Sequence, residues 1–348
     1  MARMTRQAIY FTAPHVVEVR EEPLEMPARG EVLVAVALTA ISPGTEMLIY
    51  RGLMPRGMKT DATIPALGGE LAYPLKYGYA SVGQVIAVGP GVSEEWRGRW
   101  VFAFQPHQSH YVAPVEEVVP LPEEVSPKDG VFLPNMETAV NFLMDGRPMI
   151  GERVLVFGQG IVGLLTTALL ASMPLSLLVT LDRFPLRRDA SGALGASVTL
   201  DPAVPDIKER LMAYVGSPEG TGGADLVYEL SGAPEALNLA IALTGFNGRI
   251  IVGSWYGAKQ AALDLGGHFH RSRMRIVSSQ VSTLAPEHVG RWDKARRLKT
   301  AWEHVARVRP SRFITHLFPA TQAHEAYRLI AQHPEQTIQV LLQWDTSI

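Results

Sequence analysis

The 348-residue chain contains no cysteine. This absence excludes disulfide bonds, iron–sulfur clusters, thiolate nucleophiles and every zinc site that needs cysteine ligands. Any chemistry of this protein must therefore come from other side chains or from a bound cofactor.

Long apolar runs and a large excess of one charge are also absent. The formal net charge is −2, which gives no electrostatic basis for binding nucleic acid or an anionic membrane. The first apolar run, Gln7–Phe11, is too short for a signal peptide or a membrane span. We expect a cytoplasmic protein whose partner is a small molecule rather than nucleic acid or a membrane.

The most informative segment that is present is a glycine motif after a short apolar run, Val154–Phe157. Such a run is typical of a buried parallel strand, and an apolar helix to about Ala171 follows the motif G-x-G-x-x-G. Gly158 would allow the tight turn, Gly160 the approach of a pyrophosphate, and Gly163 close packing of helix on strand. The free N–H groups of the helix start would bind the phosphates, so we predict a dinucleotide site.

A second apolar strand ends on Asp182, which Arg183 follows directly. An acid at this place accepts hydrogen bonds from the adenosine ribose and repels the 2′-phosphate of NADP, so we expect NAD. Arg183 stacks on the adenine or else holds a 2′-phosphate, which keeps NADP as the less favoured alternative. The other expected cofactor contacts lie at the helix start and at strand ends: Ile161, Val162, Ser231, Gly232, Gly253 and Ser254.

The pattern of elements changes along the chain. The first third has short apolar strands broken by glycine and proline, among them Glu31–Leu38 and Ala80–Gly89, which is typical of a β-rich domain. From Asn135 onward strands and helices alternate, which indicates a parallel sheet. We therefore predict an α/β protein with a β-rich part and a doubly wound part.

This order of elements resembles the medium-chain dehydrogenase/reductase superfamily. The resemblance rests on Gly78–Val85, on the glycine motif with Asp182, and on Ile314–Pro319 followed by Ala323–Tyr327. Ser42–Glu46 and Asn135–Ala139 resemble the branch of bacteriochlorophyllide a dehydrogenases and threonine- or polyol-dehydrogenase-like proteins.

The resemblance implies two domains and a site. Residues 1–134, completed by 283–348, would form a GroES-like catalytic domain, and residues 135–282 a Rossmann dinucleotide-binding domain. The site would lie in the cleft between them, with Thr138 near the nicotinamide. The family also implies a homo-oligomer, a dimer or a tetramer.

The zinc ligands of the family are missing from this chain. Zinc members carry a cysteine where Pro43 stands and a histidine where Tyr79 stands, and their third ligand falls near Pro134 and Asn135. The four-cysteine structural zinc lobe is missing too. The chain therefore resembles a zinc-independent member, and we expect no metal.

Three side chains at matching positions would take over what zinc does for the substrate oxygen. Thr45 matches the hydroxyl that relays the substrate proton, and Tyr79 brings a phenol that would hydrogen-bond the oxygen. Glu46 acts as a base if burial raises its pKa, or else it caps a turn or pairs with an arginine.

The remaining candidates have structural interpretations beside functional ones. His107 and His110 would contact substrate or cofactor rather than a metal, and Trp255 would border the pocket. Glu137 would line the pocket or simply favour a helix start. His268 and His270 would line the substrate pocket or form a subunit contact; Arg271, Arg273 and Arg275 alternate and would share one face of a last strand.

The leading function is NAD-linked hydride transfer between nicotinamide and a secondary alcohol or ketone, without zinc. One alternative is an NADPH-dependent enone or quinone reductase. The other is a nucleotide-binding sensor or structural protein without catalysis.

Overall fold

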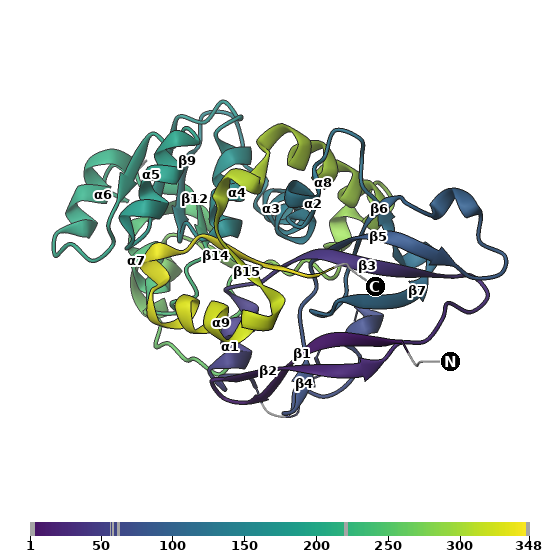
Figure 1. The fold of residues 1–348 in the computed structure, drawn as a ribbon. Coiled ribbons are helices and arrows are strands. Elements are labelled where there is room, and N and C mark those ends of the chain that lie inside the picture. Colours follow the sequence, from purple (N-terminus) through teal and green to yellow (C-terminus); the bar gives the residue numbers. More distant parts are fainter. Residues whose placement is uncertain (1–3, 56, 58, 61–62, 219–221, 346–348) are drawn as a thin grey trace. The chain divides into compact units, whose positions relative to one another are not determined.

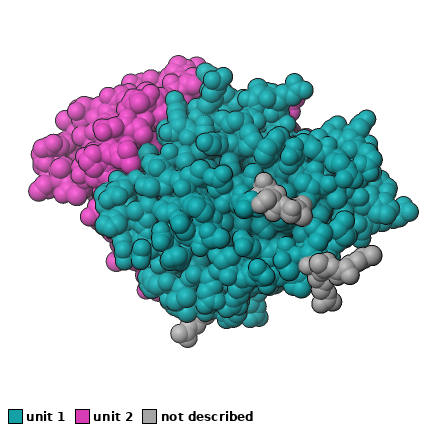
Figure 2. Space-filling model, viewed as in Figure 1, with its two compact units in different colours: residues 1–134, 302–348 teal, residues 135–301 magenta. Residues whose placement is uncertain are grey.

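The computed structural model describes residues 4–55, 57, 59–60, 63–218 and 222–345. The chain forms two compact units, which Figure 2 distinguishes by colour: residues 1–134 with 302–348, and residues 135–301. Within the described ranges, no helix has the length and apolar character that crossing a membrane requires.

The unit of residues 135–301 is built on six parallel strands. They are β9 (Arg153–Phe157), β10 (Leu177–Leu181), β11 (Val198–Leu200), β12 (Ala224–Glu229), β13 (Thr244–Val252) and β14 (Arg275–Ser278). Their order is β11-β10-β9-β12-β13-β14, so the first strand in sequence lies at the centre and the order reverses beside it. This is the order of doubly wound dinucleotide-binding sheets, which bind ligands beyond the carboxyl ends of the strands at the reversal.

Alternate residues of the central strand belong to two different hydrophobic clusters. Val154 and Val156 pack in one cluster, while Leu155 and Phe157 pack in the other, and all four are buried. Because successive side chains of a strand point to opposite faces, both faces of the sheet are covered. The helices of this unit are α3 (Leu133–Gly146), which begins in the other unit, α4 (Ile161–Leu170), α5 (Pro185–Ala193), α6 (Ile207–Val215), α7 (Ala236–Leu243) and the start of α8 (Lys294–Val308).

The other unit is rich in β-structure. A small sheet has the order β2-β1-β4, from β1 (Thr5–Ala13), β2 (Val16–Pro23) and β4 (Leu75–Lys76). A larger sheet follows the path β15-β16-β3-β5-β6-β8, with β7 also paired to β3. Its strands are β3 (Glu31–Ala40), β5 (Ser81–Val88), β6 (Trp100–Ala103), β7 (His110–Pro114), β8 (Val119–Pro120), β15 (Ile314–Pro319) and β16 (Gln339–Gln343).

The C-terminal segment completes this larger sheet. Strand β16 pairs antiparallel with β3, with Leu342 opposite Thr39, and Figure 1 shows the yellow C-terminal segment running beside purple β3. The helices of the unit are α1 (Thr45–Tyr50), α2 (Pro127–Gly130), α9 (Ala323–Gln332) and the end of α8. The predicted fold class, a β-rich part and a doubly wound parallel-sheet part, is confirmed.

One local prediction was wrong. Arg271 and Arg273 do not lie on the last strand, because β14 begins only at Arg275. Arg273 has φ of +52°, a left-handed conformation that no regular strand contains. The alternation of the three arginines therefore does not define a common strand face, although all three side chains are exposed.

Candidate functional site

The glycine motif forms a tight turn between β9 and α4. Gly158 has φ of +89°, and a β-carbon there would lie 2.6 Å from the Cα of Ser231. A β-carbon on Gly163 would lie 2.0 Å from the carbonyl oxygen of Gly158. Each position thus requires glycine for packing, independently of any ligand.

Gly160 differs from the other two glycines. It is the N-cap of α4, and no described atom beyond its two chain neighbours lies within 4 Å of the place that its β-carbon would take. No side chain caps this helix end, so the N–H groups of its first turn are available to an anion. Ile161, the first residue of the helix, is buried, and Val162 is half-buried against the core.

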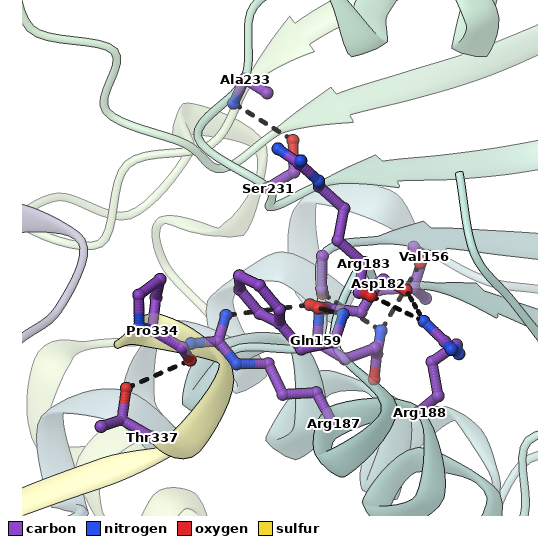
Figure 3. A network of polar contacts seen from close by, with 12 residues as sticks. Val156, Gln159, Asp182, Arg183, Arg187, Arg188, Ser231, Ala233, Pro334 and Thr337 are labelled. Carbon is purple, nitrogen blue, oxygen red and sulfur yellow. Dashed lines mark hydrogen bonds and ion pairs between the residues drawn. The ribbon is translucent and has the colours of Figure 1, made fainter. Parts of the chain in front are cut away.

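Asp182 follows β10 and holds the glycine turn from the side. Its Oδ2 accepts a hydrogen bond from the Gln159 N–H (2.8 Å; Figure 3), and its Oδ1 accepts one from the Phe184 N–H (2.9 Å). The carboxylate is 7% exposed. Because a carboxylate oxygen accepts more than one hydrogen bond, acceptor capacity for ribose hydroxyls remains.

Three arginines surround this acid (Figure 3). Arg188 donates from Nη1 to the carbonyl oxygens of Asp182 and Arg183, at 2.8 Å each, so it braces the loop after β10. The Nη1 of Arg187 lies 3.9 Å from Asp182 Oδ2, and its guanidinium covers the ring of Phe184. The side chain of Arg183 is exposed.

A buried carboxylate that sequence reasoning missed lies at the ends of β12 and β13. Glu229 is fully buried; its Oε1 accepts hydrogen bonds from the N–H (2.8 Å) and hydroxyl of Ser231, and its Oε2 accepts one from the Tyr256 hydroxyl at 2.5 Å. Burial and the Glu229 carboxylate raise the pKa of Tyr256. The Ser254 hydroxyl accepts the Gly232 N–H (2.9 Å). Glu229 therefore fixes the strand-end turn in which the predicted contacts Ser231 and Gly232 lie.

The two neighbours of Ser254 have different surroundings. A β-carbon on Gly253 would lie 2.3 Å from Cζ of Phe142, so this glycine is required by the packing of α3 on the sheet. Trp255 is half-buried.

The sequence does contain a signal for Glu229: an acid ends an apolar strand directly before a Ser-Gly turn.

Glu46 is the centre of a second buried network, in the β-rich unit. Its Oε1 accepts the Ser42 N–H (2.8 Å), and its Oε2 lies 2.5 Å from the Tyr327 hydroxyl and 3.0 Å from His107 Nε2. Both Glu46 and His107 are completely buried. A β-carbon on Gly78 would lie 2.7 Å from His107 Cδ2, so the glycine makes room for the imidazole.

These contacts are those of a turn-capping residue. The Glu46 side chain closes the turn that starts α1, while burial and Glu46 raise the pKa of Tyr327 and keep that hydroxyl protonated. Of the interpretations open for Glu46, the capping one matches these contacts.

Hydroxyl groups gather at the same turn. The Tyr79 hydroxyl lies 2.5 Å from the Ser42 Oγ, and half-buried Thr45 is the first residue of α1. Ser42 was not among the predicted residues. Its position beside Pro43, where zinc members carry a ligand, is the signal that would have indicated it.

The other histidine of this segment is also internal. His110 lies on β7 with its Nδ1 3.0 Å from the Ser109 hydroxyl, and burial lowers the pKa of His110. No group of three or more metal-ligating carboxylates or histidines occurs within the described residues. Pro43 offers no side-chain ligand, and the Tyr79 hydroxyl is engaged with Ser42, so the residues at the family's zinc positions do not fit a zinc ion.

Glu137 and Thr138 lie on α3. The helix begins at Leu133, so Glu137 stands in its second turn rather than at its start. Its Oε1 accepts hydrogen bonds from Arg297 Nε (3.0 Å) and Nη2 (2.9 Å), and both side chains are almost completely buried. This carboxylate is therefore committed to an internal ion pair instead of a pocket wall. Thr138 is half-buried.

The histidines after β13 do not lie beside the strand ends described above. The Nε2 of His268 lies 2.9 Å from the carbonyl oxygen of Thr244, the first residue of β13. This is the amino-terminal edge of the parallel sheet, whereas Ser231 and Ser254 lie at its carboxyl-terminal edge. His270 is exposed.

Comparison with known proteins shows which enzymes the chain resembles. The family model of zinc-binding dehydrogenases matches residues 162–298. A D-guloside 3-dehydrogenase of Escherichia coli (strain K12) is 24% identical over 344 residues, with 94% of this chain and 97% of that protein covered. The 2-desacetyl-2-hydroxyethyl bacteriochlorophyllide A dehydrogenase of Rhodobacter capsulatus is 24% identical over 355 residues, with 98% and 99% covered. Residues 162–298 thus match the zinc-binding dehydrogenase family, and nearly the whole chain is similar to these dehydrogenases.

Two solved structures share the fold of nearly the whole chain. A short chain alcohol dehydrogenase (rspB) from E. coli CFT073, complexed with NADH, superposes with a TM-score of 0.78 at 20% identity, covering 97% of this chain and 99% of that one. A chain from Sinorhizobium meliloti 1021 bound to NADP has a TM-score of 0.75 at 18% identity, with 98% and 100% covered. The family model matches only residues that follow Pro43 and Tyr79 in the chain. The word zinc in its description therefore says nothing about a zinc ligand at either position.

Proposed function

We propose that this medium-chain dehydrogenase/reductase is an NAD(H)-dependent oxidoreductase that transfers hydride between nicotinamide and a secondary alcohol or ketone without zinc. The observation that carries the proposal is the glycine turn. Gly158 and Gly163 are required by contact with backbone, while Gly160 leaves open space at an uncapped helix start beside a buried acid.

The residues of the turn fit a dinucleotide. The N–H groups at the start of α4 would bind the pyrophosphate, and Asp182 would accept the ribose hydroxyls. Ser231 and Gly232, which Glu229 fixes in place, would border the bound cofactor. The nicotinamide supplies the hydride acceptor or donor when it is bound, and this chain supplies its orientation.

The proton would be handled by hydroxyl groups of the β-rich unit. The Glu46 carboxylate accepts a hydrogen bond from the Ser42 N–H, and the Ser42 hydroxyl accepts one from the Tyr79 hydroxyl. The buried Glu46 thus positions the phenol of Tyr79 through Ser42. We infer that the Tyr79 hydroxyl turns from Ser42 to donate to the substrate oxygen and so polarises it, and that Thr45 relays the substrate proton. Neither step uses Glu46 as a base, because its oxygens are engaged with Ser42, Tyr327 and His107.

A second candidate, an NADPH-dependent enone or quinone reductase, is favoured by one observation. Arg183 is exposed and two further arginines lie beside Asp182. Guanidinium groups bind phosphates well, so a 2′-phosphate has partners here. The solved relative bound to NADP is compatible with this alternative.

The cofactor preference is tested by titrating metal-stripped protein with NADH and NADPH, with energy transfer from tryptophan as the readout. We expect tighter binding of NADH, and we expect Asp182→Asn to reduce or abolish that preference because the 2′-phosphate no longer faces a carboxylate. Asp189→Asn, an exposed acid on α5, is the matched control and should leave the preference unchanged. Tighter binding of NADPH by the unmodified protein would make Arg183 the phosphate ligand and favour the reductase alternative, and binding of neither cofactor would contradict hydride transfer.

The hydroxyl mechanism is tested by Tyr79→Phe and Thr45→Ala. Because positioned acid–base groups contribute about 10²- to 10⁴-fold, we expect each change to lower turnover of a secondary alcohol by about 100-fold with NADH affinity retained. Tyr214→Phe, which removes the hydroxyl of a largely exposed tyrosine on α6, is the control. Unchanged turnover in both variants, or a turnover that rises when zinc is added, would refute zinc-free proton relay.

A further inference from the structure

Four cationic side chains line one hollow in the β-rich unit. Lys128 comes from α2, Arg307 from the last turn of α8, and Arg309 and Arg312 from the segment that follows α8. The hollow has a volume of about 910 Å³, and Ser311 is also among its lining residues. All four cationic residues are exposed to solvent.

A buried acid brings these distant segments together without neutralising them. The Oδ1 of Asp129 accepts the Ser311 N–H at 2.8 Å, and its Oδ2 accepts the Ser126 hydroxyl at 2.6 Å. Asp129 is thus directed into the protein, and it joins α2 to the segment after α8. In the described part of the chain, no ion pair joins Lys128, Arg307, Arg309 or Arg312 to a carboxylate.

Arg309 stands where a side chain is unfavourable. Its φ is +51°, and its N–H donates to the Val305 carbonyl oxygen at 2.9 Å, so it ends α8 in a left-handed conformation. Glycine or asparagine usually takes this place, because a β-carbon is strained there. Pro310 explains why the helix stops, since the residue before proline disfavours helical backbone, but it does not explain an arginine.

Stabilisation of the helix dipole accounts for only part of the cluster. Arg307 and Arg309 at the end of α8 complement the partial negative charge of its carbonyl groups. Lys128 and Arg312 belong to other segments, and four like charges around one hollow repel one another. Arg312 also lies over the Phe313 ring, 4.9 Å from its centroid, which holds the guanidinium in place.

We propose that this hollow binds a soluble, multiply charged phosphate anion. Three of its four cations are guanidinium groups, which bind phosphate oxygens in bidentate geometry. The whole chain carries a net charge of −2, so this local positive field is not a property of the overall composition. The inference does not depend on the proposed hydride transfer.

The test is calorimetric titration of the full chain with pyrophosphate at constant ionic strength. We expect saturable binding that falls by about tenfold or more in Arg309→Gly/Arg312→Ala, since two charge-assisted contacts are lost. Lys299→Ala, which removes an exposed cation of α8 outside the hollow, should bind as tightly as the unmodified protein. Arg309→Gly alone should weaken binding while leaving the thermal midpoint of the unliganded protein equal or higher, because glycine relieves the left-handed strain.

Pyrophosphate could also bind at the glycine turn, and the variants separate the two sites. Binding that persists in Arg309→Gly/Arg312→Ala and is displaced by NADH would place the anion at the turn and overturn the proposal. Heat no greater than that of sodium chloride at equal ionic strength would overturn it too. Binding to phosphatidylglycerol vesicles without binding to pyrophosphate would equally overturn it in favour of a membrane surface.

Discussion

Replacement of Arg297 by methionine is expected to lower the free energy of unfolding by about 3–5 kcal/mol, because it leaves a buried carboxylate without its partner. Arg297 donates from Nε and Nη2 to Glu137 and from Nη1 to the Asn141 side chain at 2.7 Å. It also donates to the backbone carbonyl oxygens of Val281 and Thr283. One guanidinium therefore joins α3, the segment after β14, and α8.

The double variant Arg297→Met/Glu137→Leu separates the charge from the packing. An apolar pair in the same space should recover a large part of the lost stability, since the cost of one unpaired charge exceeds the benefit of the pair. Arg210→Met is the surface control: this arginine pairs with Asp206 on the exposed side of α6, and its loss should change stability little. Urea unfolding measures all three variants. Equal stability of Arg297→Met and the unmodified protein would contradict the ion pair.

Replacement of Gly163 by alanine is expected to abolish dinucleotide binding and to destabilise the unit of residues 135–301. The added methyl group would lie 2.0 Å from the carbonyl oxygen and 2.9 Å from the carbonyl carbon of Gly158, and both are backbone atoms that cannot turn aside as a flexible side chain does. Relief requires α4 to move away from β9, at a cost of about 3 kcal/mol, the upper end of what overpacking typically costs. Thermal unfolding and NADH titration would show both effects.

Gly160→Ala is the matched control within the same motif. Its methyl group meets no described atom within 4 Å beyond its two chain neighbours, so we expect normal folding. It would, however, stand at the helix start where the pyrophosphate approaches, so NADH affinity should fall by about tenfold or more. If Gly160→Ala bound NADH as tightly as the unmodified protein, the proposed place of the pyrophosphate would be wrong.

The elements around the cofactor site could be predicted because their signals are local. Apolar runs with flanking glycine predicted the central strands, and the structure has β9 at Arg153–Phe157 and β10 at Leu177–Leu181. The roles of Gly158 and Gly163 follow from the same short segment, since the motif contains both the turn and the helix that packs on it.

The prediction for the last strand failed because alternation alone does not define a strand. Arg271, Arg273 and Arg275 alternate in sequence, but the turn before β14 requires a left-handed residue at Arg273. A hydrogen bond from the Arg273 N–H to the carbonyl oxygen of His270, at 3.3 Å, completes this turn. His270 lies in the preceding helical segment. A period of two is therefore also compatible with an irregular segment.

The sequence by itself determined the α/β class, the glycine turn and the acid after the second strand, because each depends on neighbours within one supersecondary unit. Only the tertiary structure decided what the other polar residues do. Glu46 meets His107 and Tyr327 across 61 and 281 residues of chain, and Glu137 meets Arg297 across 160. A buried charge must find its partner in space, and pairs so distant in sequence leave no periodic signal, so their assignment needed the packed fold.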